Sequence, residues 1–562
     1  MTFAAAAHAR IEYEGLEISG TFFQFNEFRY GGKGGPKVYA LGLDGAPRGV
    51  YLRPWDLQNN PPFPFITEQD KYRTVNAFRQ ELTLELTYKN IPHFTPVVKL
   101  RPFWDGMFTI ENKKYSTLSR FWESNFWNGN LEDKWDPLFR EAYVDINFHP
   151  LFIRAGRQLV TWGRSDGVSV LDNVNPNNFR NPLTFEQERF RIPLWMLNTS
   201  YDFSGWDWIP GASKELQVLW NMQYVPSRIP GFTAQEAGQH PWTLNVVDFA
   251  DQVINTQKFL YNQPNFFHPY QWNQNGSFFE QSEVFLRWRG SVSEGLGEPF
   301  NDFTYSLHYG YLFNRVPLYV LRHRSDAGLA IDVAGPRLPR PGGGTTGGIN
   351  FESRRYSFVG FSFDKALLWL PGQFEGTAFR GEASYNFGNF YYDPSLQVGR
   401  TDNTTFMLGL DQYLYLAPRN IIGTPWFTSW QIWQDWTIDK PGKGAYTKLD
   451  SQACANQPGC GKRGWIELGQ YNLFKGMRQQ QRTITTLFMF NDFLPGKVLH
   501  VELFGLAEFE NMATWFRAVV GYNFTTALSA RVGTNQIWGP SSSFFGQFGE
   551  NDVIFTEFKW TF

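Results

Sequence analysis

Cysteine is nearly absent from this chain: Cys454 and Cys460 are the two among 562 residues. No Cys-x-x-Cys-His sequence occurs, which argues against covalently attached c-type haem. The two cysteines lie close together around Pro458-Gly459. This spacing predicts a local disulfide formed in an oxidising compartment, with two free thiols in a loop as the alternative.

Long apolar runs and a large net charge of either sign are also absent. No run of about 18 apolar residues occurs, so a transmembrane helix is excluded. The formal net charge is −2, which gives no reason to expect nucleic acid as a partner. Mean hydropathy is −0.38, as in water-soluble proteins. A transmembrane barrel remains allowed, because its strands alternate lipid-facing and lumen-facing residues and their average stays polar.

Aromatic residues are abundant, and many of them follow a period of two. In the C-terminal segment, Ile554, Phe558 and Trp560 share one face of an extended strand, and Glu557 and Lys559 lie on the other. A mostly apolar face opposite a charged face is typical of a strand between two media. The segment also resembles the terminal strands of bacterial outer-membrane barrels, which end in an aromatic residue like Phe562.

The same alternation recurs along the chain. Short and long connections between the segments mostly alternate, as in outer-membrane barrels with tight periplasmic turns and long outer loops. The connection at 510–511 is the exception, since it should be an outer loop and is very short. We identify about 18 such segments, at residues 16–30, 75–89, 95–106, 137–148, 151–162, 194–203, 214–224, 281–291, 301–313, 354–364, 376–386, 402–414, 424–436, 482–492, 498–509, 512–524, 527–538 and 551–562.

These segments predict an all-β fold, a closed antiparallel transmembrane β-barrel of about 18 strands, with 16 as the alternative count. Residues 16–562 form the barrel, with long extracellular loops, short periplasmic turns and at least one loop folded into the lumen. Residues 1–15 form an N-terminal tail, in which Ala7-His8-Ala9 resembles the end of a secretory signal. The segments 163–193 and 225–280 are the candidate lumen or plug loops.

The charged faces of the strands should point into the lumen, because a charged side chain facing lipid is costly. Acidic and basic residues nearly balance there, which argues against a strongly ion-selective pore. The same charges could form structural ion pairs that brace the wall or could contact a transported molecule. The candidate lumen residues are Arg154, Gln158, Trp162, Glu283, Arg287, Arg289, Glu502, Arg517, Arg531, Glu557 and Lys559.

The densest motif spans residues 154–193. Gly156-Arg157-Gln158, Trp162-Gly163 and Asn175-Pro176 resemble a family of Gram-negative outer-membrane proteins of unknown function, DUF1302. The resemblance implies an outer-membrane location. It also implies that the protein acts together with an inner-membrane exporter of the resistance–nodulation–division type and a periplasmic lipoprotein-like partner. These partners suggest the transport of lipids or other hydrophobic molecules.

Oxygen-bearing side chains are concentrated in the same motif. Asp172, Asn175 and Asn177 are candidate plug-loop residues and could supply oxygens to Ca²⁺. The favoured interpretation is that they form turns in a folded-in loop, with no metal site. Arg157 falls on the apolar face of its strand, so either its side chain snorkels or a bulge shifts the register.

A nucleophile motif also matches, at Gly163-Arg-Ser-Asp-Gly167. The esterase elbow needs a strand, a turn and a helix within an α/β sheet. No alternation of strands and helices is present, so we expect no enzymatic activity. An outer-membrane hydrolase using Ser165 or His308 remains an alternative.

The pattern as a whole predicts a channel or transporter barrel of the bacterial outer membrane for a small hydrophobic or amphipathic, lipid-like molecule. A structural docking barrel with a closed lumen is the alternative. The expected contacts are membrane lipid and lipopolysaccharide, and no cofactor is expected apart from bound lipid or detergent. The number of copies in the assembly does not follow from the sequence.

Overall fold

The computed structural model describes nearly all of the predicted strand residues and part of the connections. It describes residues 11–30, 38–41, 47–50, 75–105, 139–166, 168–178, 190–206, 208, 211–222, 224–227, 278–292, 301–315, 318–322, 338–339, 345–346, 348–352, 354–392, 398–416, 424–438, 481–494, 496–510, 512–539, 545 and 552–562. Cys454 and Cys460 lie outside these ranges, so their predicted disulfide stays a prediction.

One antiparallel sheet of 20 strands dominates the fold. Two of these strands do not add to the wall. The short β1 (Ile11–Tyr13) pairs with the start of β2 (Leu16–Arg29). The segments β6 (Phe94–Leu100) and β7 (Phe103–Asp105) pair with different parts of β5 (Val75–Tyr88) and form one interrupted strand. The wall therefore has 18 strands.

The other wall strands follow in chain order around the barrel. Each of the predicted segments contains one strand, so the all-β barrel is confirmed, with 18 strands and not 16. These strands are β8 (Phe139–Phe148), β9 (Leu151–Gln158), β10 (Leu194–Asp202), β11 (Ser213–Asn221), β12 (Glu283–Val292), β13 (Phe303–Phe313), β18 (Arg355–Leu367), β19 (Thr377–Tyr392), β20 (Val398–Leu414), β21 (Trp426–Thr437), β22 (Gln481–Phe493), β23 (Leu499–Glu508), β24 (Ala513–Asn523), β25 (Leu528–Trp538) and β26 (Val553–Thr561).

The barrel closes between its first and last strands. β2 pairs with β5 on one edge and with β26 on the other, with Phe22 opposite Trp560. The amide of Gly20 donates to the carbonyl of Phe562, and the amide of Phe562 donates back to Gly20. Closure removes the free edges that a flat sheet would expose, which a wall in lipid requires.

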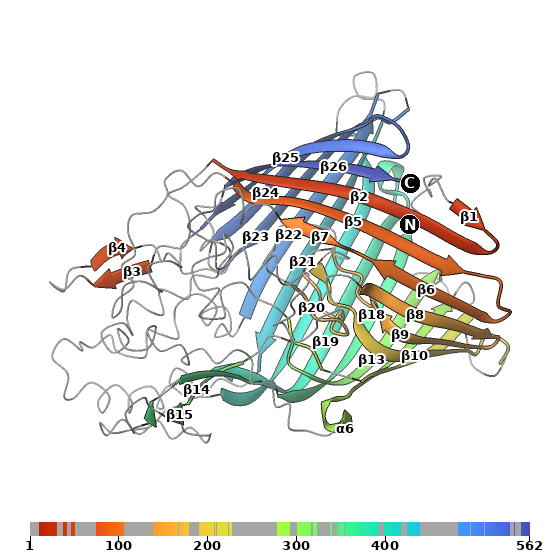
Figure 1. The fold of residues 1–562 in the computed structure, drawn as a ribbon, viewed down its shortest axis with the longest axis horizontal. Coiled ribbons are helices and arrows are strands. Elements are labelled where there is room, and N and C mark those ends of the chain that lie inside the picture. Colours follow the sequence, from red (N-terminus) through yellow and green to blue (C-terminus); the bar gives the residue numbers. More distant parts are fainter. Residues whose placement is uncertain are drawn as a thin grey trace.

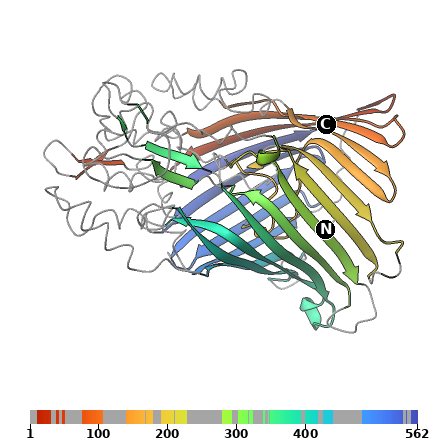
Figure 2. The ribbon, with the colours of Figure 1, turned by 90° about the horizontal axis from the view of Figure 1, so that it is seen from below.

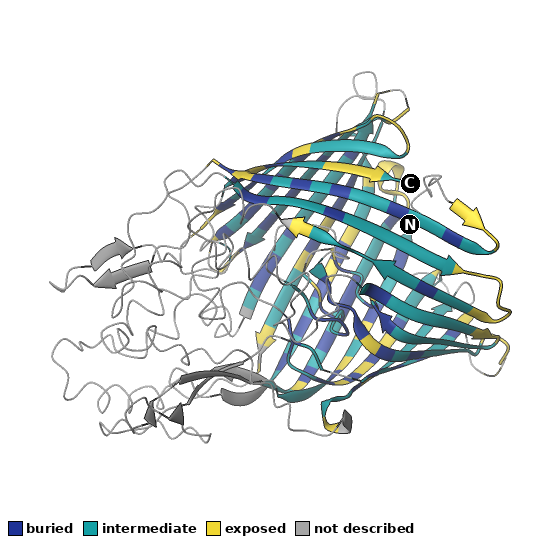
Figure 3. Ribbon diagram, in the orientation of Figure 1, coloured by how far each residue is buried: buried dark blue, intermediate teal, exposed yellow. Residues whose placement is uncertain are grey.

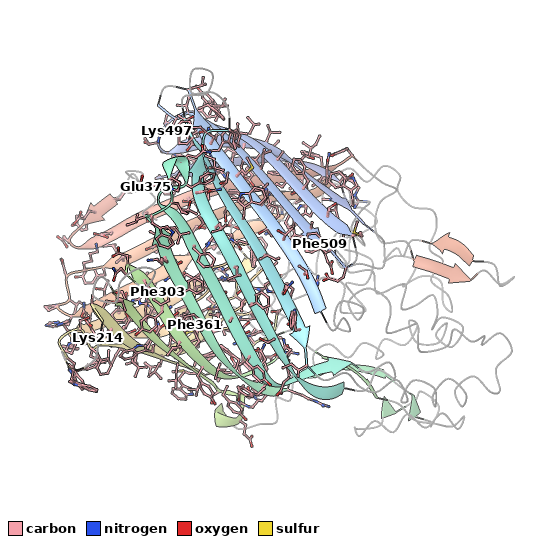
Figure 4. All side chains as sticks on the ribbon, turned by 180° about the vertical axis from the view of Figure 1, so that it is seen from behind. Lys214, Phe303, Phe361, Glu375, Lys497 and Phe509 are labelled. Atoms are coloured by element: carbon pink, nitrogen blue, oxygen red, sulfur yellow. The ribbon has the colours of Figure 1, made fainter. Side chains whose placement is uncertain are left out.

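The connections sort to the two ends of the barrel (Figures 1 and 2). Short turns such as 149–150 and 524–527 lie at the end where β2 begins and β26 finishes. The long connections, such as 30–74 and 222–282, leave from the other end. The connection between β23 and β24 is as short as the sequence indicated, although it lies at the long-loop end. In Figure 4, Glu375 and Lys497 mark the short-turn end and Phe509 the long-loop end.

Side chains alternate between the two faces of every wall strand, because a pleated strand has a period of two. Figure 3 shows the result as alternating bands of buried and more exposed residues. On β26, Phe555 is buried, whereas its neighbours Ile554 and Phe558 are exposed on the outer face. The inner face of the wall therefore defines the lumen, and the outer face carries the apolar belt.

Little else is regular among the described residues. The helical elements are the one-turn α6 (Phe278–Gln281) and the 3₁₀ turn η1 (Gly372–Phe374). Among the described residues, no helix is long and apolar enough to cross a membrane. Three small ladders pair β3 (Val38–Leu41) with β4 (Pro47–Val50), β14 (Leu318–Arg322) with β17 (Gly348–Glu352), and β15 (Leu338–Pro339) with β16 (Thr345–Thr346).

Candidate functional site

The chain turns into the lumen directly after β9. We call residues 159–193 the lumen loop, of which 159–166, 168–178 and 190–193 are described. The loop returns to the wall at the start of β10, which pairs with β9 along its whole length. Both strands are short, because the wall ends where the chain turns inward.

An apolar cluster packs the lumen loop against the inner face of the wall. From the loop, Trp162, Val170, Leu171 and Val174 are all buried. They meet inward-facing side chains of six strands, β10 to β13, β18 and β20. Full burial of a Leu or Val side chain contributes about 1.5–3 kcal/mol, so the loop has a defined seat on this part of the wall. The wall residues of the cluster are Leu194, Met196, Leu219, Phe285, Leu312, Phe358 and Met407.

Trp162 is the central side chain of this contact. Its indole nitrogen donates a 2.9 Å hydrogen bond to Gln217 on β11. Its ring meets Phe285 edge to face at 5.8 Å and lies 5.1 Å from the His308 ring. The guanidinium of Arg287 lies over the same ring at 5.6 Å. The sequence-predicted residues Trp162 and Arg287 are therefore in contact.

Glu382, on β19, binds the backbone of the lumen loop. One carboxylate oxygen accepts a hydrogen bond from the amide of Arg164, and the other accepts one from the amide of Leu171 at 3.4 Å. The Glu382 side chain is almost completely buried. A carboxylate that accepts backbone amides makes charge-assisted hydrogen bonds, which are stronger than neutral ones.

Asp166 forms a second polar anchor beside the first. Its amide donates to Gln431 on β21 at 3.0 Å, and the Gln431 amide group donates back to its carboxylate at 2.9 Å. Arg380 on β19 also pairs with Asp166, and it pairs with Asp411 at 2.9 Å. Arg164 reaches Asp364 on β18 at 2.9 Å. Polar side chains of three strands, β18, β19 and β21, thus hold the loop.

Inside the lumen loop, Asp172 and Asn175 hold its two arms together. Asn175 accepts from the amide of Val160 at 2.8 Å and donates to the carbonyl of Ile192 at 2.9 Å. Asp172 accepts from the amide of Trp162 at 3.1 Å and forms an ion pair with Arg191. Burial lowers the pKa of Arg191 to about 10, so its guanidinium stays charged at neutral pH.

Of the oxygens considered for Ca²⁺, those of Asp172 and Asn175 thus accept hydrogen bonds from the backbone of the loop itself. The described residues contain no cluster of His, Cys, Asp or Glu with metal-binding geometry. The amide of Asn177 donates to the hydroxyl of Ser227 at 3.0 Å. Ser227 belongs to the second candidate plug segment, 225–280, of which 225–227 and 278–280 are described.

Arg315 fastens the far side of the lumen loop and was missed from the sequence. Its guanidinium donates to the carbonyls of Asn173 at 2.9 Å and Val174 at 2.7 Å. It also pairs with Glu283 at 2.8 Å, where both side chains are buried. Arg315 follows β13 at the start of a long connection, so no periodicity marked it as an inward residue. Glu283 was predicted to face the lumen, and the structure places it there beside Arg315.

The remaining part of the inner wall carries a row of aromatic rings that we call the aromatic wall. It runs over β21 to β24, β26 and β2. Phe427 lies 5.0 Å from Phe490, and Phe504 lies 5.2 Å from Trp515. Phe427 and Phe490 share the inner face with Gln431, which touches the lumen loop. The other rings of the aromatic wall are Phe23, Phe25, Trp433, Phe488 and Phe555.

Charged groups lie between these rings. Arg517 on β24 is 3.4 Å from Glu502 on β23 and 3.7 Å from Glu557 on β26. Its guanidinium also lies over the Phe555 ring at 4.4 Å. His500 lies 3.7 Å from Glu502. Three of the predicted lumen residues, Glu502, Arg517 and Glu557, therefore form one network.

The other predicted lumen residues lie apart from this network. Arg154 pairs with Asp145 at 2.6 Å, and Arg289 pairs with Glu215. Gln158 donates to the carbonyl of Met196 at 3.1 Å. Arg531 and Lys559 point to the lumen from β25 and β26, where Arg531 is opposite Glu557 and Lys559 is opposite Ser529.

Arg157 stays on the outer face of β9, as the alternation indicated, because the pairings with β8 and β10 run through Gly156 without a register shift. Its side chain is 1% exposed. The preceding Gly156 has a φ of 135°, a backbone conformation that favours glycine. A Cβ at Gly156 would lie 2.3 Å from the carbonyl oxygen of Ala142 on β8. This close backbone contact explains the glycine of the Gly-Arg-Gln motif.

The residues of the hydrolase alternative do not combine into a catalytic group. His308 Nε2 is 2.7 Å from the hydroxyl of Ser306, which in turn is 2.6 Å from Ser362. His308 Nδ1 and the hydroxyl of Ser165 are buried, and neither has a hydrogen-bond partner among the described residues. A Ser-His-Asp arrangement needs an acid on that ring nitrogen, and none of the described residues provides it.

Comparison with protein families identifies the sequence. The family described as "Protein of unknown function (DUF1302)" matches residues 68–562. The chain belongs to this family. The match covers the wall from β5 to β26 together with the lumen loop, and it confirms the resemblance of the Gly-Arg-Gln motif.

Three solved structures are similar to this chain. Acinetobacter baumannii OccAB3 has 8% identity and a TM-score of 0.42, over 97% of this chain and 99% of that chain. The outer membrane channel DcaP of Acinetobacter baumannii has 9% identity and a TM-score of 0.35, over 98% and 99%. Pseudomonas aeruginosa OccK5 has 9% identity and a TM-score of 0.40, over 98% of both chains. Similarity at this level says nothing about cargo. Comparison with curated proteins finds no match.

Proposed function

We propose that this protein is an outer-membrane channel that carries a small amphipathic molecule between the lumen loop and the aromatic wall. One observation carries the proposal. The lumen loop is seated against β10 to β21, whereas the inner face of β21 to β24, β26 and β2 carries aromatic rings with ion pairs between them, and of these rings Phe488 and Phe490 are partly exposed. Such a surface suits a molecule with an apolar part and a polar group.

The same architecture supports an outer-membrane location. A closed barrel with paired backbone groups and an apolar outer face fits a bilayer. The inner-membrane exporter and the lipoprotein-like partner are expected from the family resemblance alone. These two partners, and a lipid as the cargo, stay predictions.

The test is single-channel recording on the purified protein in planar bilayers. The probes are naphthalenesulfonate and ethanesulfonate, which share a charged group and differ in the aromatic part. We expect a measurable conductance and longer current blockades with naphthalenesulfonate. In Phe490→Ala the blockades by naphthalenesulfonate should shorten about two- to tenfold, because one aromatic contact contributes about 0.5–1.5 kcal/mol.

Trp430→Ala is the matched control, because Trp430 is an exposed aromatic residue on the outer face of β21. It should leave the blockades unchanged. Absence of any conductance would support the docking barrel with a closed lumen instead. Blockades of equal duration with the two sulfonates would show that the aromatic wall does not bind the aromatic part of the solute.

A further inference from the structure

One sector of the outer face differs from the rest of the barrel. Over β13, β18, β20 and β21 the exposed outer residues are large and apolar, as a lipid-facing surface requires. Phe303 and Phe361 are labelled on that wall in Figure 4. The sector formed by β24 to β26, β2 and β5 also exposes large apolar residues, such as Tyr522, Ile554 and Trp560, but amides and hydroxyls lie among them. The large apolar residues of the first wall include Leu307, Phe361, Leu408, Leu410, Trp430 and Ile432.

Four polar side chains form what we call the outer polar patch: Gln24, Asn26, Gln80 and Thr556. Gln24 lies directly opposite Gln80 on β5, and Asn26 lies opposite Thr556 on β26. They share a face with Phe28, which is exposed on the outer surface. The outer polar patch therefore faces away from the lumen, where the membrane is expected.

The depth of the outer polar patch makes it unusual. Along β2, Gln24 and Asn26 lie between Phe22 and Phe28. Along β26, Thr556 is flanked by the exposed Ile554 and Phe558. The polar groups are thus inside the apolar belt and not at its edge. Polar groups in hydrocarbon are expensive unless they are hydrogen-bonded.

The chain itself satisfies only part of this hydrogen-bonding capacity. Asn26 donates to Thr556 at 3.0 Å, and Gln24 donates to Asn26 at 3.4 Å. Within the described residues the amide of Gln80 has no partner. The carbonyl of Gln24 likewise accepts no bond there. Donors and acceptors are therefore left over on one surface.

A shallow groove of about 550 Å³ adjoins the outer polar patch. Asn26 and Thr556 form one side of it, and Val520, Ala530 and Phe558 contribute to the rest. Small residues on a membrane-exposed wall allow another backbone to approach closely. Lipid acyl chains cannot form hydrogen bonds with the amides beside the groove. The groove and the outer polar patch are therefore better suited to contact another protein than to contact lipid.

From these observations we infer that a second copy of this chain docks on the outer face of β24 to β26, β2 and β5. The partner must be embedded in the membrane, because the outer polar patch is bracketed by apolar residues and out of reach of soluble proteins and lipid headgroups. It carries no formal charge, so a charged partner has nothing to pair with. Amides both donate and accept hydrogen bonds. The same patch on a second copy related by a two-fold axis therefore supplies the donors and acceptors that the first copy leaves without partners.

The available area agrees with a stable contact. Five strands spaced about 4.8 Å apart over an apolar band about 25 Å tall offer on the order of 600 Å² of flat wall. Stable protein interfaces bury about 800 Å² of accessible surface per partner, and side chains raise the accessible area above that of the flat wall.

The experiment measures mass in lipid nanodiscs. Each particle of the full-length wild-type protein should contain two chains of 65.1 kDa. Replacing the three amides together, as Gln24→Leu, Asn26→Leu and Gln80→Leu, should lower the association constant roughly 20-fold, since each hydrogen bond in a membrane contributes a factor of about three. Ser357→Leu, on the outer face of β18, is the matched control and should retain the wild-type mass.

A second measurement covers the case in which the triple variant fails to fold. A benzophenone side chain at position 80 should crosslink two copies of this chain, and one at position 357 should not. A wild-type protein that is a single barrel in nanodiscs overturns the inference. A folded triple variant with the wild-type mass also overturns it, as does crosslinking from position 80 to lipopolysaccharide or to another protein. Because conductance is measured on single barrels, failure here leaves the channel proposal standing.

Discussion

The lumen loop can be loosened without altering the wall by the substitution Glu382→Gln. The carboxylate of Glu382 accepts the amides of Arg164 and Leu171. Hydrogen bonds to a charged group contribute about 1.5–3 kcal/mol each. Glutamine has the same shape and keeps one acceptor oxygen, but it places an NH₂ group against one of the two amides. We therefore expect the seated loop to lose about 2–4 kcal/mol relative to a displaced loop.

That loss corresponds to a rise of about 30- to 700-fold in the population of displaced loops, since 1.4 kcal/mol is a factor of ten. Single-channel recording should show a larger mean conductance or new high-conductance openings. Glu557→Gln is the control, because Glu557 is also an inward carboxylate and lies 3.7 Å from Arg517 on the wall. Identical recordings from wild type and Glu382→Gln would contradict the view that this carboxylate holds the loop.

Two further substitutions test the seat of the lumen loop. Trp162→Ala should destabilise the seated loop by about 3–5 kcal/mol, because it leaves a cavity against Phe285. Single-channel recordings should then show more frequent high-conductance openings. Unchanged openings would mean that the apolar cluster does not hold the loop. Asp172→Asn removes the carboxylate that pairs with the buried Arg191 and should destabilise the seated loop by roughly 3–5 kcal/mol. We expect faster protease cleavage within 159–193, while the barrel keeps its heat-resistant migration on a gel. Equal cleavage rates in the variant and the wild type would show that this ion pair is dispensable.

The strands and their two faces could be predicted because a period of two is a local property. Alternation along β26 already separates Ile554 and Phe558 from Glu557 and Lys559, whatever that strand pairs with. The long connections were equally visible, since their length does not depend on tertiary contacts. Even the exceptionally short connection between β23 and β24 could be read directly from the chain.

The contacts of the lumen loop could not be predicted in the same way. Arg164 and Glu382 are 218 positions apart, and Asp166 and Gln431 are 265 apart. Nothing in the sequence pairs such residues, because the curvature of the closed wall decides which inward side chains the loop meets. Arg315 was missed for the same reason, and the alternation does not show that Arg157 is buried on the outer face.

The sequence by itself determined a barrel of about 18 strands, the residues that face inward and outward, and the segment 163–193 as a candidate plug. Only the tertiary structure decided that the loop is seated against β10 to β21, that the aromatic wall lines β21 to β24, β26 and β2, and that the outer polar patch lies on one sector of the outer face. Strand faces depend on neighbouring residues, whereas these three features depend on closure, which brings β2 beside β26 from opposite ends of the chain.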